Sequence, residues 1–556
     1  MLLSEEQDYV ADGGEGRIYA QGKIIYKIYH DRRNMIPEAK IAELVVLDRF
    51  NIIRPQDVLL NDKHEVIGFT MARVEGIELC RLFNTVFLQS NSITPEMLVK
   101  LVEQMQETIR FIHDQKCLIV DGNEMNYLVD GGAYTTPFFI DVNSYQTPHF
   151  PATAYTPLFC DPHAKDFSPL TDWFAFAIVA CKIFVGIHPY KGNHPQYGKK
   201  DVLQRMIDHV SIFNRETTLP VAARDFSYIP AAYYEWFVKL FEKGERLPPP
   251  YIAGLLKVVQ VTAEMIRSTG NFAIKLLRQY AEDIIKHKAA HGIQVVVTKN
   301  AVALNQTTHK LKAFEGDVAF SPKTLTPLCV SVRESDGMLL ITEPNGPALN
   351  LTLKVSRKPF IVDNAIYAFQ HGDLTEIAIH EINNKPVAAV TNVWKIMPQS
   401  SAIFDGVIYQ TVLGKAYLVI PHHAAGKSYC AIQALPELDA YKIVDGKHDN
   451  HVCMLIGVKD DLYHRLILRF DEHYNTYDLR VVEDIDYPSL NFVTLDHGIV
   501  VSLDEHAAVE VFSNKVGAAK IKRIEDPAIK TGMILSKDGA NVLFYTGNRL
   551  YSLKMV

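Results

Sequence analysis

The sequence predicts an α+β domain of two lobes over residues 1–250 and an all-β propeller of about six blades over residues 294–556. A helical connector is expected over residues 251–293. Short strands and amphipathic helices alternate in the first part. From Gly292 onward, short runs with a period of two are separated by Asp, Asn, Gly and His turns, and the later runs recur at roughly 41–47 residues, the period of a four-stranded blade. Five or seven blades, or a pair of β-sandwiches, are the alternatives for this part.

Composition narrows the class of protein. The chain has 556 residues, 48% apolar and 22% charged, with a net charge of −7, which argues against nucleic acid or an anionic membrane as a partner. Its seven cysteines show no C-x-x-C spacing, which favours a reducing cytosol over disulfides or zinc. The N-terminal MLLSEEQDYV is not typical of a signal peptide, and no apolar run reaches about 18 residues. We expect a cytoplasmic protein with no membrane partner.

Residues 8–29 are expected to form a strand, a glycine-rich turn and two further short strands. Gly13, Gly14 and Gly16 leave the backbone free to close over phosphates, although a plain hairpin turn is the alternative. Lys27 follows between apolar neighbours in IIYKIY. A lysine on such a strand needs a partner for its charge, so this position indicates a binding site.

The segment PEAKIAELVVLDRF is predicted to be a helix that turns one glutamate inward. Ile41 and Val45 continue the face that starts at Glu38, so Glu38 is preferred and Glu43 is the second choice. A solvated helix face is the alternative for either residue. The next helix is expected to begin at Thr94-Pro95, by the rule of an N-cap followed by proline.

The segment from Leu118 to Gln146 contains the most informative pattern. An apolar run leads to Asp121, Asn126 follows five residues later, and a second apolar run leads to Asp141. Phosphoryl transfer from ATP needs one carboxylate to orient the attacking hydroxyl, and an amide and a second carboxylate to hold Mg²⁺. The alternative is that these side chains only cap turns.

Two further segments follow. Residues 144–156 are rich in proline and hydroxyl groups, and Ser144, Tyr145, Thr147, Thr153, Tyr155 and Thr156 are candidates for phosphorylation. Asp172 then starts a helix that is apolar on all sides and therefore buried. In the connector, AIKLLRQYAEDIIKHKAA has apolar residues at helical spacing from Ile274 to Ile285.

In order and rough spacing, these residues resemble the protein kinase superfamily over about residues 8–250. The segments DVNSYQ, DWFAFA and FVGIHPYKG resemble the corresponding segments of a bacterial serine/threonine kinase-like subgroup. The resemblance implies ATP and Mg²⁺ as cofactors. It implies that Asp121 orients the substrate hydroxyl and accepts its proton, and that Asp172 supports the catalytic loop.

The resemblance also implies the other binding roles. Lys27 and Glu38 would hold the phosphates, and Asn126 and Asp141 would bind the metal. The remaining nucleotide-binding residues would be Gly13, Gly14, Gly16 and Ile18 in the glycine-rich segment, and Met71 where the chain passes between the lobes.

The sequence departs from the kinase pattern in four places. Ile119 stands where a histidine is usual, and Asn123 where a lysine is usual. Asn143 replaces the glycine of D-F-G, and asparagine is the best non-glycine substitute where a left-handed backbone conformation is needed. Asp161-Pro162-His163 replaces A-P-E, so the glutamate expected to pair with Arg246 is absent.

We therefore predict a protein serine/threonine kinase whose substrate is a protein or its own 144–156 segment, and the four departures are compatible with weak activity. The second half is expected to recruit or sense an unknown protein partner. Alternatives are a nucleotide-binding pseudokinase scaffold, a small-molecule phosphotransferase, and a structural protein with chance motifs. A metal at His422-His423 or at His448, His451 and Cys453 is not favoured.

Overall fold

The computed structural model describes residues 3–250, 270–290, 292–305, 307–311, 314–424, 426–518 and 520–555. The chain begins with a five-stranded antiparallel sheet in the order β1-β2-β3-β5-β4. Its strands are Tyr9–Asp12 (β1), Gly16–Gln21 (β2), Ile24–Tyr29 (β3), Pro55–Leu60 (β4) and Val66–Ala72 (β5). Helix α1 (Glu38–Leu44) packs against this sheet through a cluster that includes Tyr29, Ile36, Ile41 and Phe69.

Gly16 shows why a glycine is needed at the start of β2. A Cβ atom at this position would lie 2.3 Å from the carbonyl oxygen of Ile28 on the neighbouring strand β3. Any other residue would therefore push β2 and β3 apart and disturb the turn between β1 and β2.

A helical region follows and contains the largest hydrophobic core of the described residues. Its helices are Thr85–Ser90 (α2), Pro95–Asp114 (α3), Pro169–Val185 (α4), Val202–Ile207 (α5) and Ala231–Phe241 (α6). A small sheet, Ile77–Glu78 (β6), Tyr127–Val129 (β7) and Pro137–Phe139 (β8), lies within this region. Short 3₁₀ helices are Arg32–Asn34 (η1), Leu79–Phe83 (η2), Glu124–Asn126 (η3), Val142–Ser144 (η4), Pro157–Phe159 (η5), Phe226–Tyr228 (η6) and Pro436–Leu438 (η7).

Two helix predictions are confirmed. The Thr94 hydroxyl accepts a hydrogen bond from the Met97 amide at 3.4 Å, and Pro95 is the first residue of α3. Every residue of α4 from Thr171 to Val185 is buried, as the all-apolar pattern predicted. None of the helices in the described ranges is long and apolar enough to cross a membrane.

The second half is built from seven consecutive antiparallel sheets in its described residues. The first three are Ile284–Ala290 (β10), Ile293–Thr298 (β11), Ala301–Leu304 (β12) and Thr307–Lys310 (β13); Gly316–Phe320 (β14), Pro327–Arg333 (β15) and Met338–Thr342 (β16); and Phe360–Val362 (β17), Ala365–Gln370 (β18), Asp373–Ile382 (β19) and Lys385–Lys395 (β20). The next two are Ser401–Ile403 (β21), Ile408–Val412 (β22), Lys415–Ala424 (β23) and Lys427–Ala434 (β24); and Lys442–Asp449 (β25), Val452–Lys459 (β26), Leu462–Phe470 (β27) and Tyr477–Val482 (β28).

The last two sheets complete the chain. They are Asn491–Thr494 (β29), Ile499–Leu503 (β30), Ala508–Ser513 (β31) and Ile521–Glu525 (β32); and Ile534–Asp538 (β33), Asn541–Thr546 (β34) and Arg549–Met555 (β35), to which Phe272–Gln279 (β9) adds a fourth strand. Seven separate sheets do not fit a pair of β-sandwiches, and seven is one of the two alternatives to the six repeating units expected from the spacing.

The prediction of a helical connector is wrong over residues 272–279 and 284–290, which form β9 and β10. The remainder of the predicted connector, residues 251–269, lies outside the described residues. The physical reason is that β9 pairs with β35, with Ile274 opposite Leu553. Pairing across such a distance in sequence overrides a local helical pattern.

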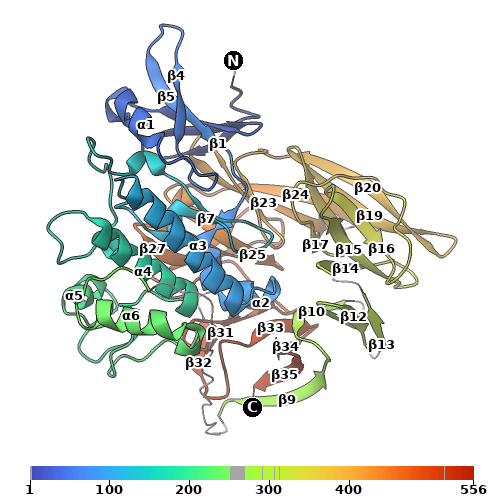
Figure 1. Cartoon of the computed structure of the whole chain (residues 1–556). Helices are drawn as coiled ribbons and strands as arrows, with labels where there is room; N and C mark the ends of the chain where they lie inside the picture. Colours follow the sequence, from blue (N-terminus) through green and yellow to red (C-terminus); the bar gives the residue numbers. More distant parts are fainter. Residues whose placement is uncertain are drawn as a thin grey trace.

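The two halves share a hydrophobic core. The helices gather on one side of the molecule and the C-terminal sheets extend on the other (Figure 1). Val444, Ile456, Tyr463 and Ile485 from the second half belong to the same buried cluster as α3 and α4. Beside this cluster, Arg81 of η2 donates to the carbonyl oxygen of Val444 at 2.8 Å and to the carboxylate of Asp445 at 2.6 Å.

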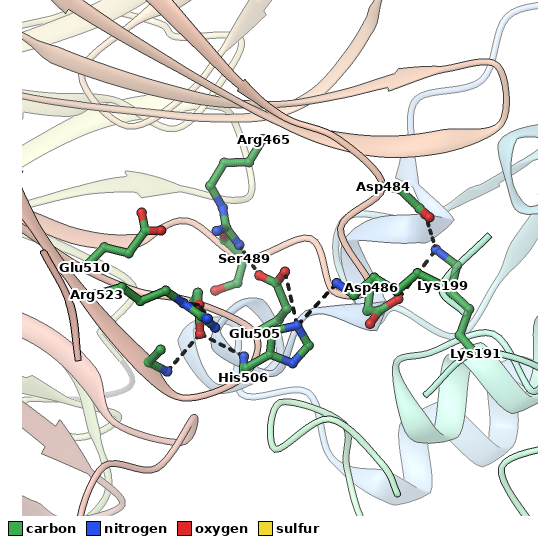
Figure 2. A network of polar contacts seen from close by, with 12 residues as sticks. Lys191, Lys199, Arg465, Asp484, Asp486, Ser489, Glu505, His506, Glu510 and Arg523 are labelled. Atoms are coloured by element: carbon green, nitrogen blue, oxygen red, sulfur yellow. Dashed lines mark hydrogen bonds and ion pairs between the residues drawn. The ribbon is translucent and has the colours of Figure 1, made fainter. Parts of the chain in front are cut away.

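A polar network extends this contact (Figure 2). Lys191 of the helical region forms ion pairs with Asp484 at 2.7 Å and Asp486 at 3.7 Å. Within the second half, Arg465 and Glu505 form a buried ion pair at 2.8 Å. The second half and the helical region therefore form an interface of both apolar and charged contacts.

Candidate functional site

The structure brings Asp121 and Asn126 together. The side-chain amide of Asn126 donates to the backbone oxygen of Asp121 at 2.9 Å and to its carboxylate at 3.1 Å. Asp121 is only 8% exposed, and its second carboxylate oxygen, Oδ1, has no hydrogen-bond partner among the described residues. This oxygen is therefore available to accept a proton or a hydrogen bond from a bound hydroxyl.

Asp172, at the start of α4, supports the segment before Asp121, as predicted. Its carboxylate accepts hydrogen bonds from the backbone amides of Ile119 at 2.8 Å and Val120 at 2.9 Å. Val120 has a φ of 64°, an unfavourable value for a β-branched residue, so these two bonds stabilise a strained backbone. The ring of His113, at the end of α3, also bonds Asp172 at 2.9 Å. An imidazole therefore lies beside this segment although Ile119 stands at the position where kinases usually have a histidine.

Asp141 lies two residues after β8, directly before η4, in a left-handed conformation with φ of 57°. Burial raises the pKa of Asp141, and the nearby Lys27 ammonium acts in the opposite direction. The carboxylate groups of Glu15 and Asp121 add to the rise. Asn143 does not have a positive φ, because the left-handed turn falls on Asp141 instead.

Lys27 is buried, as its apolar neighbours indicated, and it has a partner that the sequence did not indicate. Its ammonium forms an ion pair with Glu15 at 2.7 Å. Glu15 belongs to the glycine-rich turn, and Ile18 lies opposite Lys27 in the pairing of β2 with β3. The turn is closed by a hydrogen bond from the Gly13 amide to the Gly16 carbonyl at 3.0 Å.

The inward orientation predicted for Glu38 is wrong. Helix α1 begins at Glu38, which is exposed, and buries Lys40, Ile41 and Leu44 instead. Val45, which was expected to continue the inward face, is 49% exposed. The buried face therefore runs through residues 40, 41 and 44, about a quarter turn from the predicted one.

Lys40 is a candidate residue that the sequence analysis missed. Its side chain is fully buried and donates to the carbonyl oxygen of Pro151 at 3.4 Å. Burial lowers the pKa of Lys40, while the carboxylates of Asp141 and Glu15 oppose this change, so a second ammonium lies beside the same site. Glu43, the second choice for the inward glutamate, instead bonds the ring of His149 at 2.6 Å.

Two other predicted contacts have different settings. Met71 lies near the end of β5 and packs, partly buried, against the cluster around Tyr29 and Phe69. Gly14 is exposed, and a Cβ atom there would have no neighbour within 4 Å. Their contacts with a nucleotide stay predictions.

The segment 144–156 is tightly attached to the site. Gln146 pairs with Leu118 through two backbone hydrogen bonds of 2.9 Å, and the Asn123 side chain donates to the Thr156 hydroxyl at 3.1 Å. Of the six candidate phosphorylation sites, four are buried, namely Ser144, Tyr145, Thr147 and Thr156. Thr153 and Tyr155 are exposed, and they are the accessible hydroxyls of this segment.

Arg246 has a partner after all. Its guanidinium forms a two-pronged ion pair with Asp161, with distances of 2.5 and 2.6 Å. Burial raises the pKa of Asp161, but Arg246 and the His163 amide outweigh it and hold this pKa below its usual value. The glutamate of the A-P-E pattern is absent, as the sequence indicated, and Asp161, two residues before His163, pairs with Arg246 instead.

The donor set at Asn126 and Asp141 suits Mg²⁺. The amide nitrogen of Asn126 donates to Asp121, which leaves the Asn126 Oδ1 free as an oxygen ligand, and the Asp141 carboxylate would be the second ligand. Mg²⁺ prefers oxygen ligands and usually takes few from the protein, with water and phosphate oxygens completing its coordination. Within the described ranges, no three His, Cys, Asp or Glu side chains form a metal cluster, and His448 bonds the hydroxyl of Tyr474 at 3.1 Å.

Comparisons with known proteins give the following. No protein-family model and no curated protein matches this sequence. Among solved structures, the autoinhibited serine kinase domain of the giant muscle protein titin has 14% identity and a TM-score of 0.34, and the match covers 44% of this chain and 76% of that one.

Two further solved structures are similar over the same share of the chain. The PK-1 kinase of Cydia pomonella granulovirus has 13% identity and a TM-score of 0.32, covering 42% of this chain and 88% of that one. A twitchin fragment from C. elegans, with autoregulated kinase and immunoglobulin domains, has 13% identity and a TM-score of 0.34, covering 43% and 54%.

Proposed function

We propose that residues 1–250 form a protein kinase domain that transfers the γ-phosphate of Mg·ATP to a serine or threonine hydroxyl of a protein. The observation that carries this proposal is the arrangement of Asp121, Asn126 and Asp172. The Oδ1 oxygen of Asp121 has no partner, and the side-chain amide of Asn126 holds the Asp121 carboxylate. The carboxylate of Asp172 holds the backbone directly before Asp121. In this proposal, the partnerless Oδ1 of Asp121 accepts the proton of the substrate hydroxyl.

Each residue has a chemical task in this proposal. Asp121 orients the attacking hydroxyl and accepts its proton, while Lys27 and the glycine-rich turn position the phosphates. When bound, Mg²⁺ would neutralise charge on the phosphate oxygens, held by Asn126 and Asp141. Thr153 and Tyr155 are the exposed hydroxyls of the 144–156 segment, and Thr153 is therefore the proposed acceptor if the protein modifies itself.

The ion pair between Lys27 and Glu15 favours one rival function. Because Glu15 already neutralises the ammonium, a nucleotide must compete with this carboxylate for Lys27. A scaffold that binds nucleotide weakly and does not turn it over would show the same pair. Binding and transfer must therefore be measured separately.

Replacing Lys27 by methionine is expected to weaken Mg·ATP binding by about 10- to 100-fold, the size of a lost charge-assisted hydrogen bond. Titration calorimetry on the full chain measures this affinity. Lys23→Met, at an exposed position on the same hairpin, is the matched control and should leave the affinity unchanged. If the wild-type protein does not bind Mg·ATP, or if Lys27→Met binds it equally well, the proposed role of Lys27 is wrong.

The second half is proposed to be a seven-bladed propeller that binds a protein partner. Three observations support it: seven successive sheets, the closing of the last sheet by β9, and contacts between first strands of different sheets. Lys286 of β10 pairs with Asp317 of β14 at 2.6 Å, and Lys537 of β33 pairs with Asp449 of β25 at 2.7 Å. A propeller would explain such contacts, because the first strands of its blades line a common axis.

The closing of the ring by β9 can be tested with a disulfide. Lys275 and Ser552 are opposite each other on β9 and β35, so cysteines at these two positions are expected to join under oxidising conditions. The bond should stabilise the chain by about 2–4 kcal/mol, measured by urea unfolding with and without reductant. Each single cysteine variant is the control, and failure of the pair to form a bond would contradict the closed ring.

A further inference from the structure

The catalytic loop, residues 121–126, touches the C-terminal half directly. Glu124 is 4% exposed and forms a buried ion pair with Lys182 of α4. The hydroxyl of Tyr463, on β27, donates to the same Glu124 oxygen, Oε1, at 3.0 Å. Tyr463 therefore joins a strand of the second half to a residue three positions after Asp121.

Glu124 is well placed to control the geometry of the loop. It begins the 3₁₀ turn η3, which ends at Asn126, and the Asn123 side chain caps this turn by accepting from the Met125 amide at 2.8 Å. A shift of Glu124 would move Asn126, whose amide holds Asp121. Small misplacements of such groups are costly to catalysis.

Helix α4 holds the loop from two points. Asp172 in its first turn holds the backbone before Asp121, and Lys182 near its end holds Glu124. The Lys182 ammonium lies over the Tyr463 ring, 5.5 Å from its centre, and over the Phe83 ring at 5.0 Å. Because the ion pair is buried among aromatic rings, the loss of one polar partner is poorly compensated by water.

The turn between β26 and β27 also approaches the catalytic loop. Asp460 and Asp461 form this two-residue turn, both with positive φ. Burial raises the pKa of Asp461, and the carboxylates of Asp121 and Glu124 add to the rise. The hairpin that carries Tyr463 reaches the catalytic loop at Glu124, through the Tyr463 hydroxyl.

We infer that Tyr463 is a positioning residue for phosphoryl transfer, acting through Glu124 on the loop that carries Asp121 and Asn126. This inference rests on the proposed function. It makes the second half a structural part of the catalytic site, in addition to any role in binding a partner. Removing the Tyr463 hydroxyl should impair the chemical step and leave nucleotide binding at Lys27 and Asp141 intact.

The test is Tyr463→Phe in the full chain, which keeps the ring and removes one hydrogen bond. We expect kcat for γ-phosphate transfer from labelled Mg·ATP to fall about tenfold, with KM for ATP unchanged. Hydrogen exchange of the backbone amides of residues 121–127 should become faster, while exchange elsewhere stays the same. Tyr477→Phe is the matched control, because its hydroxyl bonds Glu437 at 2.8 Å at an exposed site on the next strand.

A cycle of variants tests whether Tyr463 acts through Glu124. In a chain with both Glu124→Met and Lys182→Met, the ion pair is replaced by apolar side chains, which proteins often tolerate. In that background, Tyr463→Phe should have no further effect on kcat. A further tenfold loss there would overturn the inference.

The other outcomes are also decisive. Unchanged kcat and unchanged exchange in Tyr463→Phe would overturn the inference, and so would faster exchange throughout the chain, which marks a general loss of stability. If the wild-type protein transfers no phosphate, the proposed function fails. Exchange at residues 121–127 then still decides whether Tyr463 holds the loop.

Discussion

Asp121→Asn is expected to lower the rate of phosphoryl transfer by about 10²- to 10⁴-fold, the usual contribution of a general base. Asparagine keeps the size of the side chain and an oxygen that can accept from Asn126, but it cannot take a proton at neutral pH. Affinity for Mg·ATP should change little, because the proposed metal ligands are Asn126 and Asp141. Single-turnover transfer of labelled phosphate measures the rate, and calorimetry measures the affinity.

Asp114→Asn is the control for this experiment, since Asp114 is an exposed aspartate at the end of α3. It should retain the wild-type rate. Equal rates in Asp121→Asn and wild type would show that Asp121 is not the base and that its free carboxylate oxygen has another role.

Asp172→Ala should cause the largest loss of stability among the site variants, about 2–5 kcal/mol in the free energy of unfolding. The change leaves the amides of Ile119 and Val120 buried without an acceptor and removes the partner of His113. It also releases the strained φ of Val120, so transfer activity should be lost even where the chain is still folded. Urea unfolding followed by circular dichroism measures the effect.

Asp166→Ala, in the exposed segment before α4, is the matched control and should change stability by less than about 0.5 kcal/mol. A loss at Asp172 no larger than the loss at Asp166 would mean that the backbone before Asp121 is held by other contacts.

Local patterns were sufficient to predict much of the first half. Lys27, Asp121 and Asn126 stand next to apolar runs whose burial fixes their direction, and Asp172 starts an apolar helix. The same reasoning applied to α4 would have identified Lys182, since a lysine within FAFAIVACKIFVG also needs a buried partner. Its partner, Glu124, is in the catalytic loop itself.

Contacts between distant segments could not be predicted from local patterns. Residues 272–290 have apolar positions at helical spacing, yet β9 becomes a strand because β35 offers an unpaired edge. The wrong choice of Glu38 has a different cause, because a short helix gives too few positions to fix which face is buried. The actual acidic partner of Lys27 is Glu15 in the glycine-rich turn. A single glutamate among glycines has no periodic pattern, so the sequence did not indicate this pair.

The central claim is that this chain transfers the γ-phosphate of ATP with Asp121 as the base. Its most direct test is single-turnover incubation of the full chain with labelled Mg·ATP, followed by measurement of label on protein and of free phosphate. The account predicts labelled protein in the wild type, with Thr153 as the expected position if the chain modifies itself, and at most trace label in Asp121→Asn. Wild-type protein that binds Mg·ATP but releases no γ-phosphate to any acceptor would contradict the claim and identify a nucleotide-binding scaffold.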